Sequence, residues 1–340
     1  MVNDNLFLKN GYLNFNFFDA YIEKGINYII IVGGRGTGKT FGSIDWSYTH
    51  DLPFVYSRKN QVQLDFIRSE EENPIQAVNR VMGYNLESIN KGKTTKITEA
   101  NKEVGFMVAL SAISGIRGFD AYKYKVWIYD EFIHEEHEKP LKAEFEAYNN
   151  GYETINRNRE LEGAPPIIAF LLANSNSLKS DILMGWGLVE ILRKMRKKQQ
   201  EIYVDKERPF MIVDLVNSPI SIKKKETALY RMNAGNEFSK MALGNEFAYD
   251  RTDKLKSMPL NEYIIDIQVA DLFFYKHKSR HEYYISPHQR GTPKEIIDPT
   301  GEGKKRLQRR GERYYRAFVN DKIKFENMTT KIKFENYFKP

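Results

Sequence analysis

Short apolar runs rich in β-branched residues alternate with helical spacing along the first half of the chain. Buried strands are predicted where such runs lie between turn residues, at residues 28–32, 53–56, 124–129 and 167–173. Between these runs, apolar residues recur at the spacing of a helix, at residues 41–48, 61–68, 75–81 and 135–152. A polar turn joins two short strands at residues 95–97 and 104–110, which indicates a β-hairpin. This alternation predicts an α/β fold whose mostly parallel sheet is covered by helices on both faces.

The pattern changes after Asn176. Residues 182–198 have helical spacing and end in a basic run, and residues 210–216 predict one more short strand. From about residue 233 onward, aromatic-rich strands dominate, at residues 263–269, 272–275 and 283–285. We therefore expect an α/β domain over residues 1–180, a helical linker or lid over residues 181–232, and a smaller α+β domain over residues 233–340.

One hexapeptide occurs twice near the end of the chain. Lys-Ile-Lys-Phe-Glu-Asn stands at residues 322–327 and again at residues 331–336. Two copies are too few for a solenoid, which needs several stacked repeats. The alternation of apolar and polar residues in both copies predicts two adjacent strands or a hairpin.

Residues 33–40 fit the pattern of the phosphate-binding loop, G-x-x-x-x-G-K-[ST], and follow a predicted strand directly. Glycines let the backbone N–H groups close around phosphate oxygens, and the next helix directs its positive end at the same anion. Lys39 is expected to reach the β- and γ-phosphates of ATP, and the Thr40 hydroxyl is expected to bind Mg²⁺. The predicted nucleotide-binding residues are Gly33, Gly34, Arg35, Gly36, Thr37, Gly38, Lys39 and Thr40.

A second acidic motif completes this picture. The apolar strand at residues 126–129 ends in Asp130 and Glu131, about 90 residues after the loop. Asp130 is expected to hold Mg²⁺, and Glu131 to activate the attacking water as general base. A solvated strand end would carry the same two acids, but the preceding loop favours a hydrolase. A GTPase would need a guanine-reading Asn/Thr-Lys-x-Asp, and the nearest candidate, residues 101–104, lacks the Asp.

Two further polar features follow the acidic strand. Asn174 ends the strand at residues 167–173, where it would contact the attacking water or the γ-phosphate; the alternative is a polar turn in which Asn176 or Ser177 caps the next helix. Arg157 and Arg159 precede that strand, and an arginine entering a neighbour's site would neutralise charge in the transition state. Surface ion pairs are the alternative, and the spacing allows one arginine to be the finger and the other structural.

Charge divides the chain unevenly. Residues 221–340 hold 25 Lys and Arg against 16 Asp and Glu, a net charge of +9, and the remaining 27 and 29 give residues 1–220 a net charge of −2. A basic C-terminal part suggests a polyanion partner, most simply nucleic acid, although a basic surface also serves solubility alone. The expected contacts, on a stretch that interleaves basic and aromatic residues, are Lys304, Lys305, Arg306, Arg309 and Arg310.

Several classes of protein are disfavoured. The chain has no Cys, so disulfides and cysteine metal sites are excluded. The N-terminus has no signal-peptide pattern and no segment approaches the length of a membrane span, so we expect a soluble cytoplasmic protein. His134 and His137 lie among glutamates that are more typical of an exposed helix start than of a metal site. Asp266 and Asp271 lie near each other, but no set of three or four carboxylates predicts an active nuclease.

Taken together, these motifs resemble one family. The resemblance rests on Arg35 inside the phosphate loop, on the arginine-ended strand at residues 54–58, on the extended acidic strand at residues 128–133, and on residues 156–160 before a strand ending in Asn174. The combination resembles the DNA-packaging (encapsidation) ATPases of small protein-primed tailed phages of the Salasmaviridae type, which are related to the large terminases. It is clear over residues 27–178 and fainter over about residues 228–260.

The resemblance implies a five-membered ring of ASCE-type P-loop ATPases at the portal vertex of an empty procapsid, in the host cytoplasm. Such a ring pumps double-stranded DNA inward with ATP and Mg²⁺, and some members of the family use a structural RNA. The resemblance also implies that Arg157 acts in trans. It further implies that the C-terminal domain is similar to RNase H-like terminase nucleases but has no working active site.

We therefore expect an ATP-driven translocase of double-stranded viral DNA. Two other classes stay open: another nucleic-acid-dependent ATPase, such as a helicase or a terminase with active nuclease, and a nucleotide-gated DNA-binding or assembly protein. DNA cleavage with added metal would favour a terminase, and DNA-stimulated steady-state hydrolysis would argue against the gated binding protein.

Overall fold

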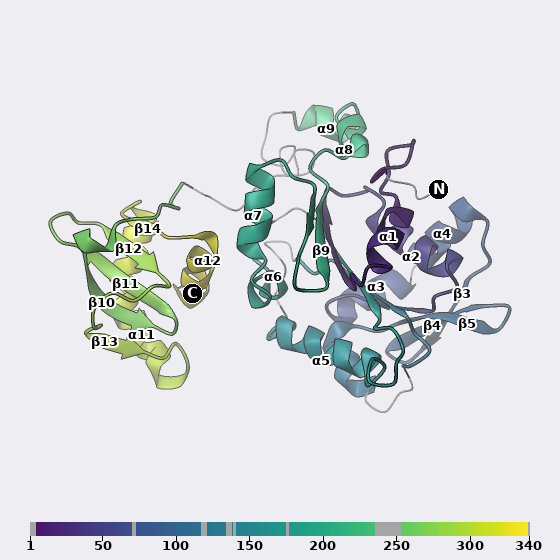
Figure 1. Ribbon diagram of the computed structural model, residues 1–340, viewed down its shortest axis with the longest axis horizontal. Coiled ribbons are helices and arrows are strands. Elements are labelled where there is room, and N and C mark those ends of the chain that lie inside the picture. The colour runs from purple at the N-terminus through teal and green to yellow at the C-terminus, as the bar shows by residue number, and fades with distance from the viewer. Residues whose placement is uncertain are drawn as a thin grey trace. The chain divides into compact units, whose positions relative to one another are not determined.

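A computed structural model describes residues 5–69, 73–116, 121–133, 138, 141–174, 177–234 and 253–338 (Figure 1). The chain forms two compact units. The first unit comprises Met1–Trp186 and Ile191–Tyr249, and the second comprises Gly187–Glu190 and Asp250–Pro340. The predicted division of the chain at residues 180 and 232 stays a prediction. None of the described helices combines the length and apolar character that a membrane span requires.

A nine-stranded sheet forms the centre of the first unit, in the order β3-β4-β5-β2-β6-β7-β1-β9-β8. Its strands are β1 (Tyr28–Gly33), β2 (Phe54–Ser57), β3 (Glu87–Lys91), β4 (Thr94–Glu99), β5 (Lys102–Met107), β6 (Val126–Asp130), β7 (Ile168–Asn174), β8 (Ile202–Val204) and β9 (Phe210–Asp214). Strands from β5 to β9 in this order are parallel, and β3, β4 and β8 pair antiparallel at the two edges. The predicted mostly parallel α/β sheet is confirmed, and β7 lies between the loop strand β1 and the acidic strand β6.

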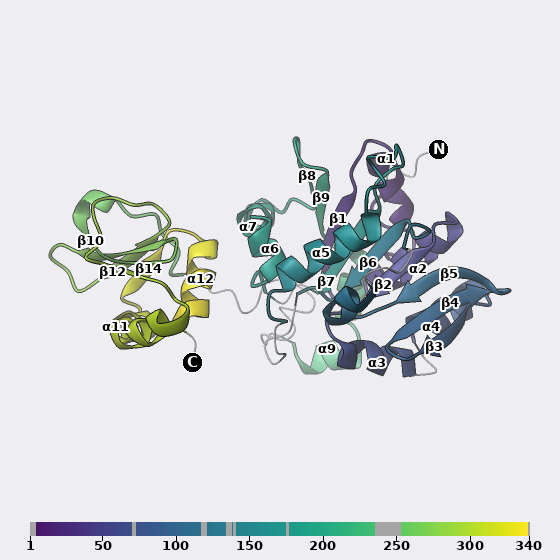
Figure 2. The same cartoon turned by 90° about the horizontal axis from the view of Figure 1, so that it is seen from below.

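Helices lie on both sides of the large sheet (Figure 2), and alternate residues of its parallel strands pack against them. On one face, Trp46 of α2 (Lys39–Thr49) contacts Phe170 of β7 edge-to-face, with ring centroids 5.3 Å apart. On the other face, Trp127 of β6 stacks on Tyr148 of α5 (Glu144–Asn156), with centroids 4.5 Å apart. All four rings are buried. A strand that is buried on both faces needs apolar residues at nearly every position. This packing therefore explains the continuous apolar runs of β1, β6 and β7.

The remaining helices up to Met232 are short. They are η1 (Phe15–Phe18), α1 (Asp19–Ile22), α3 (Gln61–Ser69), α4 (Pro74–Met82), η2 (Leu110–Ile116), α6 (Asp181–Gly185), α7 (Val189–Lys197), α8 (Pro219–Lys224) and α9 (Ala228–Met232). The single helix predicted over residues 182–198 is wrong, because Gly187 adopts a φ of +70° between α6 and α7. The helix predicted from residue 135 begins among residues outside the described ones, and α5 starts at Glu144.

The second unit has a five-stranded mixed sheet in the order β13-β10-β11-β12-β14. Its elements are η3 (Leu260–Glu262), β10 (Tyr263–Val269), β11 (Leu272–His277), β12 (Tyr283–Ser286), β13 (Glu295–Ile297), α11 (Gly301–Val319), β14 (Ile323–Phe325) and α12 (Met328–Phe338). Apolar residues of both helices, such as Tyr314 and Phe334, share one core with the strand residue Phe274. The predicted α+β character of this part is therefore confirmed.

The duplicated hexapeptide does not form a hairpin. Its first copy contains strand β14, where Ile323 and Phe325 are buried by alternation. Its second copy lies inside helix α12, where Ile332 and Phe334 are buried instead. The prediction of two adjacent strands is wrong because six residues fix only the order of apolar and polar positions, and tertiary packing then decides the conformation.

Candidate active site

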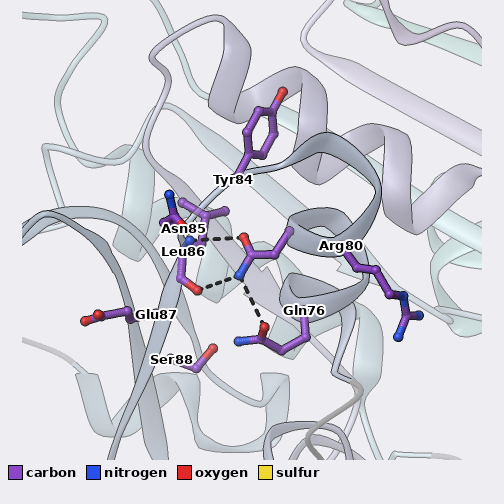
Figure 3. Close-up of a pocket in the computed structure, with 8 residues that line it drawn as sticks. Gln76, Arg80, Tyr84, Asn85, Leu86, Glu87 and Ser88 are labelled. Atoms are coloured by element: carbon purple, nitrogen blue, oxygen red, sulfur yellow. Dashed lines mark hydrogen bonds between the residues drawn. The ribbon is translucent and has the colours of Figure 1, made fainter.

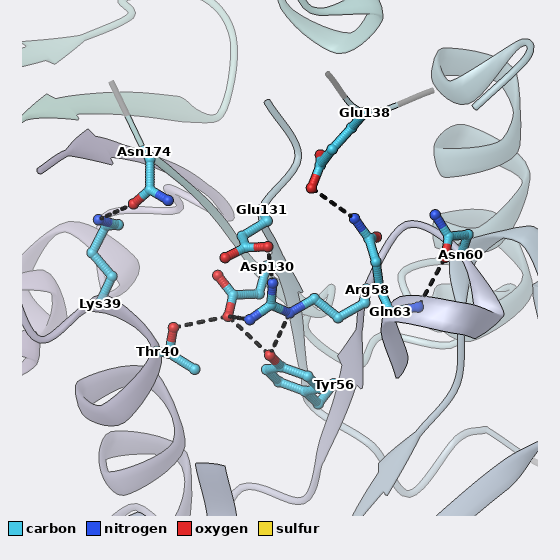
Figure 4. Close-up of polar contacts among 10 residues, drawn as sticks. All are labelled: Lys39, Thr40, Tyr56, Arg58, Asn60, Gln63, Asp130, Glu131, Glu138 and Asn174. Atoms are coloured by element: carbon cyan, nitrogen blue, oxygen red, sulfur yellow. Dashed lines mark hydrogen bonds and ion pairs between the residues drawn. The ribbon is translucent and has the colours of Figure 1, made fainter. Parts of the chain in front are cut away.

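The polar residues predicted from the sequence motifs meet at one edge of the large sheet. Gly33, at the end of β1, lies beside Asn174, at the end of β7, in the parallel register. Asp130 ends β6, and the next strand along, β2, is followed by Arg58. Because the strands are parallel, all four chain ends point toward the same side (Figure 4). This carboxyl edge is where open α/β sheets bind their ligands.

The loop between β1 and α2 wraps around the ammonium group of Lys39. Its Nζ donates to the carbonyl oxygens of Gly33 at 3.0 Å and Gly34 at 2.8 Å, and lies 3.4 Å from the Asn174 side-chain oxygen. Gly36 and Gly38 adopt φ values of +66° and +92°, which only glycine reaches without strain. Burial lowers the pKa of Lys39 to about 8, against the opposing effect of the nearby carboxylates. The loop thus presents a partly desolvated cation suited to a phosphate group.

Asp130 is the buried acid at the centre of the site, with 3% of its surface exposed. One carboxylate oxygen accepts hydrogen bonds from the hydroxyls of Thr40 at 2.8 Å and Tyr56 at 2.9 Å, and lies 3.2 Å from the Arg58 guanidinium (Figure 4). The two side chains predicted to hold Mg²⁺ are therefore already in contact. A hydroxyl and a carboxylate oxygen at the mouth of a phosphate loop fit the oxygen ligands that Mg²⁺ prefers.

Glu131, the predicted base, leaves the strand immediately after Asp130. Its backbone adopts a φ of +60°, an unusual value for a residue with a side chain, so the turn that directs its carboxylate is strained. Arg58 forms an ion pair with this carboxylate and donates from Nε to the Tyr56 hydroxyl at 2.9 Å. Burial raises the pKa of Glu131 above its usual range, and Arg58 opposes that shift. In this arrangement, one arginine engages both acids of the site.

Sequence reasoning did not assign roles to Arg58 and Tyr56, although it noted the arginine-ended strand. The signal that could have identified them is their position in the sheet. A polar residue at the end of the strand next to the acidic strand must lie beside the acids in a parallel sheet, and the register Ser57 to Tyr129 places Arg58 there.

A second buried polar cluster ties the start of helix α5 to the same edge. Glu144 is buried and accepts a hydrogen bond from the Tyr129 hydroxyl. The Lys59 Nζ, also buried, lies 3.4 Å from the other Glu144 oxygen. Burial raises the pKa of Glu144, against the effect of Lys59. Tyr129 precedes Asp130, and Lys59 follows Arg58. The start of α5 is therefore bound to the residues next to both Asp130 and Arg58.

The two arginines at the far end of α5 differ sharply. Arg159 is buried and donates to the backbone carbonyl oxygens of Tyr122 and Tyr124, so it braces the chain leading into β6. Arg157 is exposed, in a backbone conformation with φ of +50°. Asn156 accepts a hydrogen bond from the backbone of Ile167 at 2.9 Å, which places this corner at the amino end of β7. Strand β7 is seven residues long, so this corner lies roughly 20 Å from Asn174 at the other end of the strand.

Asn174 stands at the predicted place. The next helix, α6, is capped by Ser180, whose hydroxyl accepts from the backbone of Leu183 at 3.4 Å. Asn176 lies outside the described residues, and the Ser177 hydroxyl accepts from the backbone of Lys179 at 3.0 Å. The amide of Asn174 is thus available beside Lys39.

A depression elsewhere on the first unit, of about 730 Å³, is lined by α4 and the chain leading into β3 (Figure 3). Asn79 fixes its shape by a pair of hydrogen bonds with the backbone of Leu86, at 2.8 and 3.0 Å. None of its lining residues belongs to the carboxyl edge, and we assign no chemistry to it.

The five basic residues predicted to contact nucleic acid lie on helix α11, and all are exposed. Arg309 and Arg310 also line a hollow of about 260 Å³ together with Glu312, Arg313 and Arg316. Beneath this helix, the Asp266 carboxylate accepts hydrogen bonds from Arg313 and the Tyr314 hydroxyl. Within the described ranges, no three acidic, histidine or cysteine side chains gather as a metal site would require. His134 and His137 lie outside those ranges.

Comparison with known proteins gives matches in structure only. No family model and no curated protein sequence matches this chain. The Phi-28 gp11 DNA packaging motor matches 94% of this chain and 96% of that one, with 17% identity and a TM-score of 0.62. The bacteriophage Phi-29 viral genome packaging motor assembly matches 98% of this chain and 99% of that one, with 17% identity and a TM-score of 0.63. The chain has the fold of the phage DNA-packaging motors.

Within this packaging-motor fold, the P-loop, the acidic strand and Asn174 share one edge, and Arg157 occupies the opposite one. The match extends over both units of the chain, so the five-stranded C-terminal unit is part of the shared fold.

The contrast between the two arginines predicts opposite effects of alanine. Arg159→Ala should destabilise the first unit, because each buried carbonyl left without a donor costs about 1–3 kcal/mol. Arg157→Ala should leave stability within about 0.5 kcal/mol, as exposed substitutions usually do. Thermal unfolding of both variants beside the parent chain measures the difference. Equal midpoints for Arg159→Ala and the parent would contradict the bracing role.

Proposed function

We propose that the protein is an ATPase that drives double-stranded viral DNA into a procapsid, working as a ring of identical subunits. The observation that carries the proposal is the joint placement of Lys39, Thr40, Asp130, Glu131 and Asn174 at one sheet edge. Such an edge has the parts for hydrolysing a nucleoside triphosphate. The fold shared with two phage packaging motors supports DNA as the cargo.

Each residue has a separate part in hydrolysis. Lys39 and the backbone N–H groups of the loop bind the β- and γ-phosphates. Thr40 and Asp130 would hold Mg²⁺, which neutralises phosphate charge when bound. Glu131 accepts a proton from water as the water oxygen attacks the γ-phosphorus and the bond to the ADP oxygen breaks. Asn174 orients that water. In this proposal, the Glu131 carboxylate leaves its ion pair with Arg58 to serve as the base.

Arg157 acts on the site of a neighbouring subunit in this proposal. It stands roughly 20 Å from Asn174 of its own chain, a separation that an arginine side chain does not span. Its exposure at a corner of the unit leaves it accessible to a second copy. The guanidinium is always charged and can bridge two phosphate oxygens, which suits a site completed across an interface.

The second unit is proposed as the DNA-binding part. Its exposed basic residues on α11 provide charge for phosphate contacts without reading sequence. Asp266, on the first strand of its sheet, is engaged by Arg313 and Tyr314, and an acid so occupied is a poor metal ligand. This supports an RNase H-like domain that has lost nuclease function. A five-membered ring at the portal, in the host cytoplasm, completes the proposal, and the need for a structural RNA is left open.

The first test separates nucleotide binding from hydrolysis. Lys39→Ala should weaken ATP binding and abolish turnover, because it removes the charge inside the loop. Glu131→Gln should still bind ATP but hydrolyse it at least ~100-fold more slowly, the lower range for loss of a general base. Steady-state hydrolysis with and without DNA and procapsids, beside ATP binding, measures both. Near-normal turnover by Glu131→Gln would refute the assignment of the base, and turnover indifferent to DNA would favour the nucleotide-gated alternative.

The second test addresses action in trans. Arg157→Ala should lower turnover by ~10³ or more while one subunit still binds ATP. Arg157→Ala and Glu131→Gln subunits, each nearly inactive, are then mixed. Some sites in a mixed ring combine an intact Glu131 with a neighbour's intact Arg157, so hydrolysis should return. Confirmed mixed rings without recovery would place Arg157 outside the neighbour's site, and Arg35 would become the next candidate.

The third test addresses the basic helix. The double variant Arg306→Ala, Arg309→Ala should weaken DNA binding equally for unrelated sequences and reduce the salt dependence of log K by about two counterions. Its matched control is Lys256→Ala, Lys278→Ala, which removes the same charge from exposed positions of the second unit outside α11. Binding curves over a salt series distinguish them. Identical curves for both double variants would move the DNA contacts elsewhere, and metal-dependent cleavage of the DNA would favour a terminase.

A further inference from the structure

Helix α8 lies directly beside the phosphate loop, although it is about 180 residues away in the sequence. The chain leaves β9 and is fixed there by Leu215, whose backbone donates to the Val32 carbonyl at 2.8 Å and whose side chain packs on Gly33. Pro219 then contacts Gly11 of the N-terminal segment. The same segment meets the loop from its other side, since the backbone of Leu13 donates to the Thr37 carbonyl at 3.0 Å. These contacts set the position of α8 independently of any nucleotide.

The last residue of α8 reaches the loop itself. Lys224 donates from Nζ to the backbone carbonyl of Arg35, and a side chain at Gly36 would collide with that ammonium group. Its neighbour Lys223 points away, toward the Asn10 carbonyl at 3.1 Å. Among the described residues, no carboxylate forms an ion pair with Lys224. The Lys224 ammonium group thus contacts a neutral carbonyl in this part of the chain.

Three cations consequently share one phosphate loop: Arg35, Lys39 and Lys224. Like charges at one loop repel one another: burial lowers the pKa of Lys224, and the nearby charge of Arg35 lowers it further. Such a cluster is unfavourable by itself and becomes favourable when a polyanion lies among its members. Mg²⁺-bound ATP still carries a net negative charge. The cluster is suited to a triphosphate chain.

We propose that Lys224 binds the phosphate chain of the nucleotide held by its own subunit, exchanging the Arg35 carbonyl for a phosphate oxygen. The proposal rests on the proposed function, since it concerns the same nucleotide. A hydrogen bond from an ammonium group to a phosphate is stronger than one to a carbonyl, so the exchange is favourable. Lys224 lies past the last strand of the first unit, on the chain that continues to the second.

The experiment compares three variants of the full chain: Lys224→Ala, Lys224→Arg and the matched control Lys223→Ala on the same helix. Affinity for a non-hydrolysable ATP analogue with Mg²⁺ is measured by calorimetry, and the analogue-induced rise in thermal midpoint is measured in parallel. Lys224→Ala should bind the analogue at least tenfold more weakly and show a smaller rise. Lys224→Arg should stay within about threefold of the parent, and Lys223→Ala should match it.

The outcomes separate this proposal from the one on which it rests. If the parent chain does not bind the analogue, the proposed ATPase function fails. If the parent binds it and Lys224→Ala binds it equally well, the role of Lys224 is overturned while the ATPase function stands. A merely structural role would lower the midpoint of the nucleotide-free Lys224→Ala protein but leave the analogue-induced rise unchanged, and that result would also overturn the proposal.

Discussion

The carboxylate of Asp130 is the contact on which the rest of the site depends. It joins the hydroxyl of Thr40, at the start of α2, to Tyr56 and Arg58, at the end of β2. Three segments distant in sequence are therefore held at fixed separation by one buried acid. A buried carboxylate is tolerated only when its hydrogen-bonding capacity is filled. The phosphate loop, β6 and the end of β2 thus stabilise one another. Loss of any one partner of Asp130 would leave a buried carboxylate with unfilled hydrogen-bonding capacity, which is unfavourable.

The two motifs at this edge could be predicted because their chemistry is local. A phosphate loop needs glycines and a lysine within eight consecutive residues, and the acidic strand needs two acids after an apolar run. The partners of these motifs were not predictable in the same way. Arg58, Tyr56 and Lys224 reach the site through the order of strands in the sheet and through the docking of α8. No local spacing encodes that order.

Burial in the folded structure also distinguishes the two arginines that sequence spacing left as alternatives. Sequence alone allowed either Arg157 or Arg159 to be structural, and only the position of the Tyr122 and Tyr124 carbonyls distinguishes them. The duplicated hexapeptide makes the same point for secondary structure. Identical residues form a strand beside β12 in one copy and a helical turn in the other, because different neighbours cover their apolar side chains. Local sequence restricts the choices, and long-range packing selects among them.

Helix α5 has a mechanical consequence. Its first residue is tied to Tyr129 and Lys59, and its last turn ends at Arg157. A helix of thirteen residues is a stiff rod of about 20 Å, so any displacement at one end is transmitted to the other. In the proposed ring, Arg157 would thereby be tied through one helix to β6, the strand that ends in Asp130 of its own subunit. In that proposal, a displacement at the end of β6 in one subunit would reach the neighbouring subunit through α5 itself.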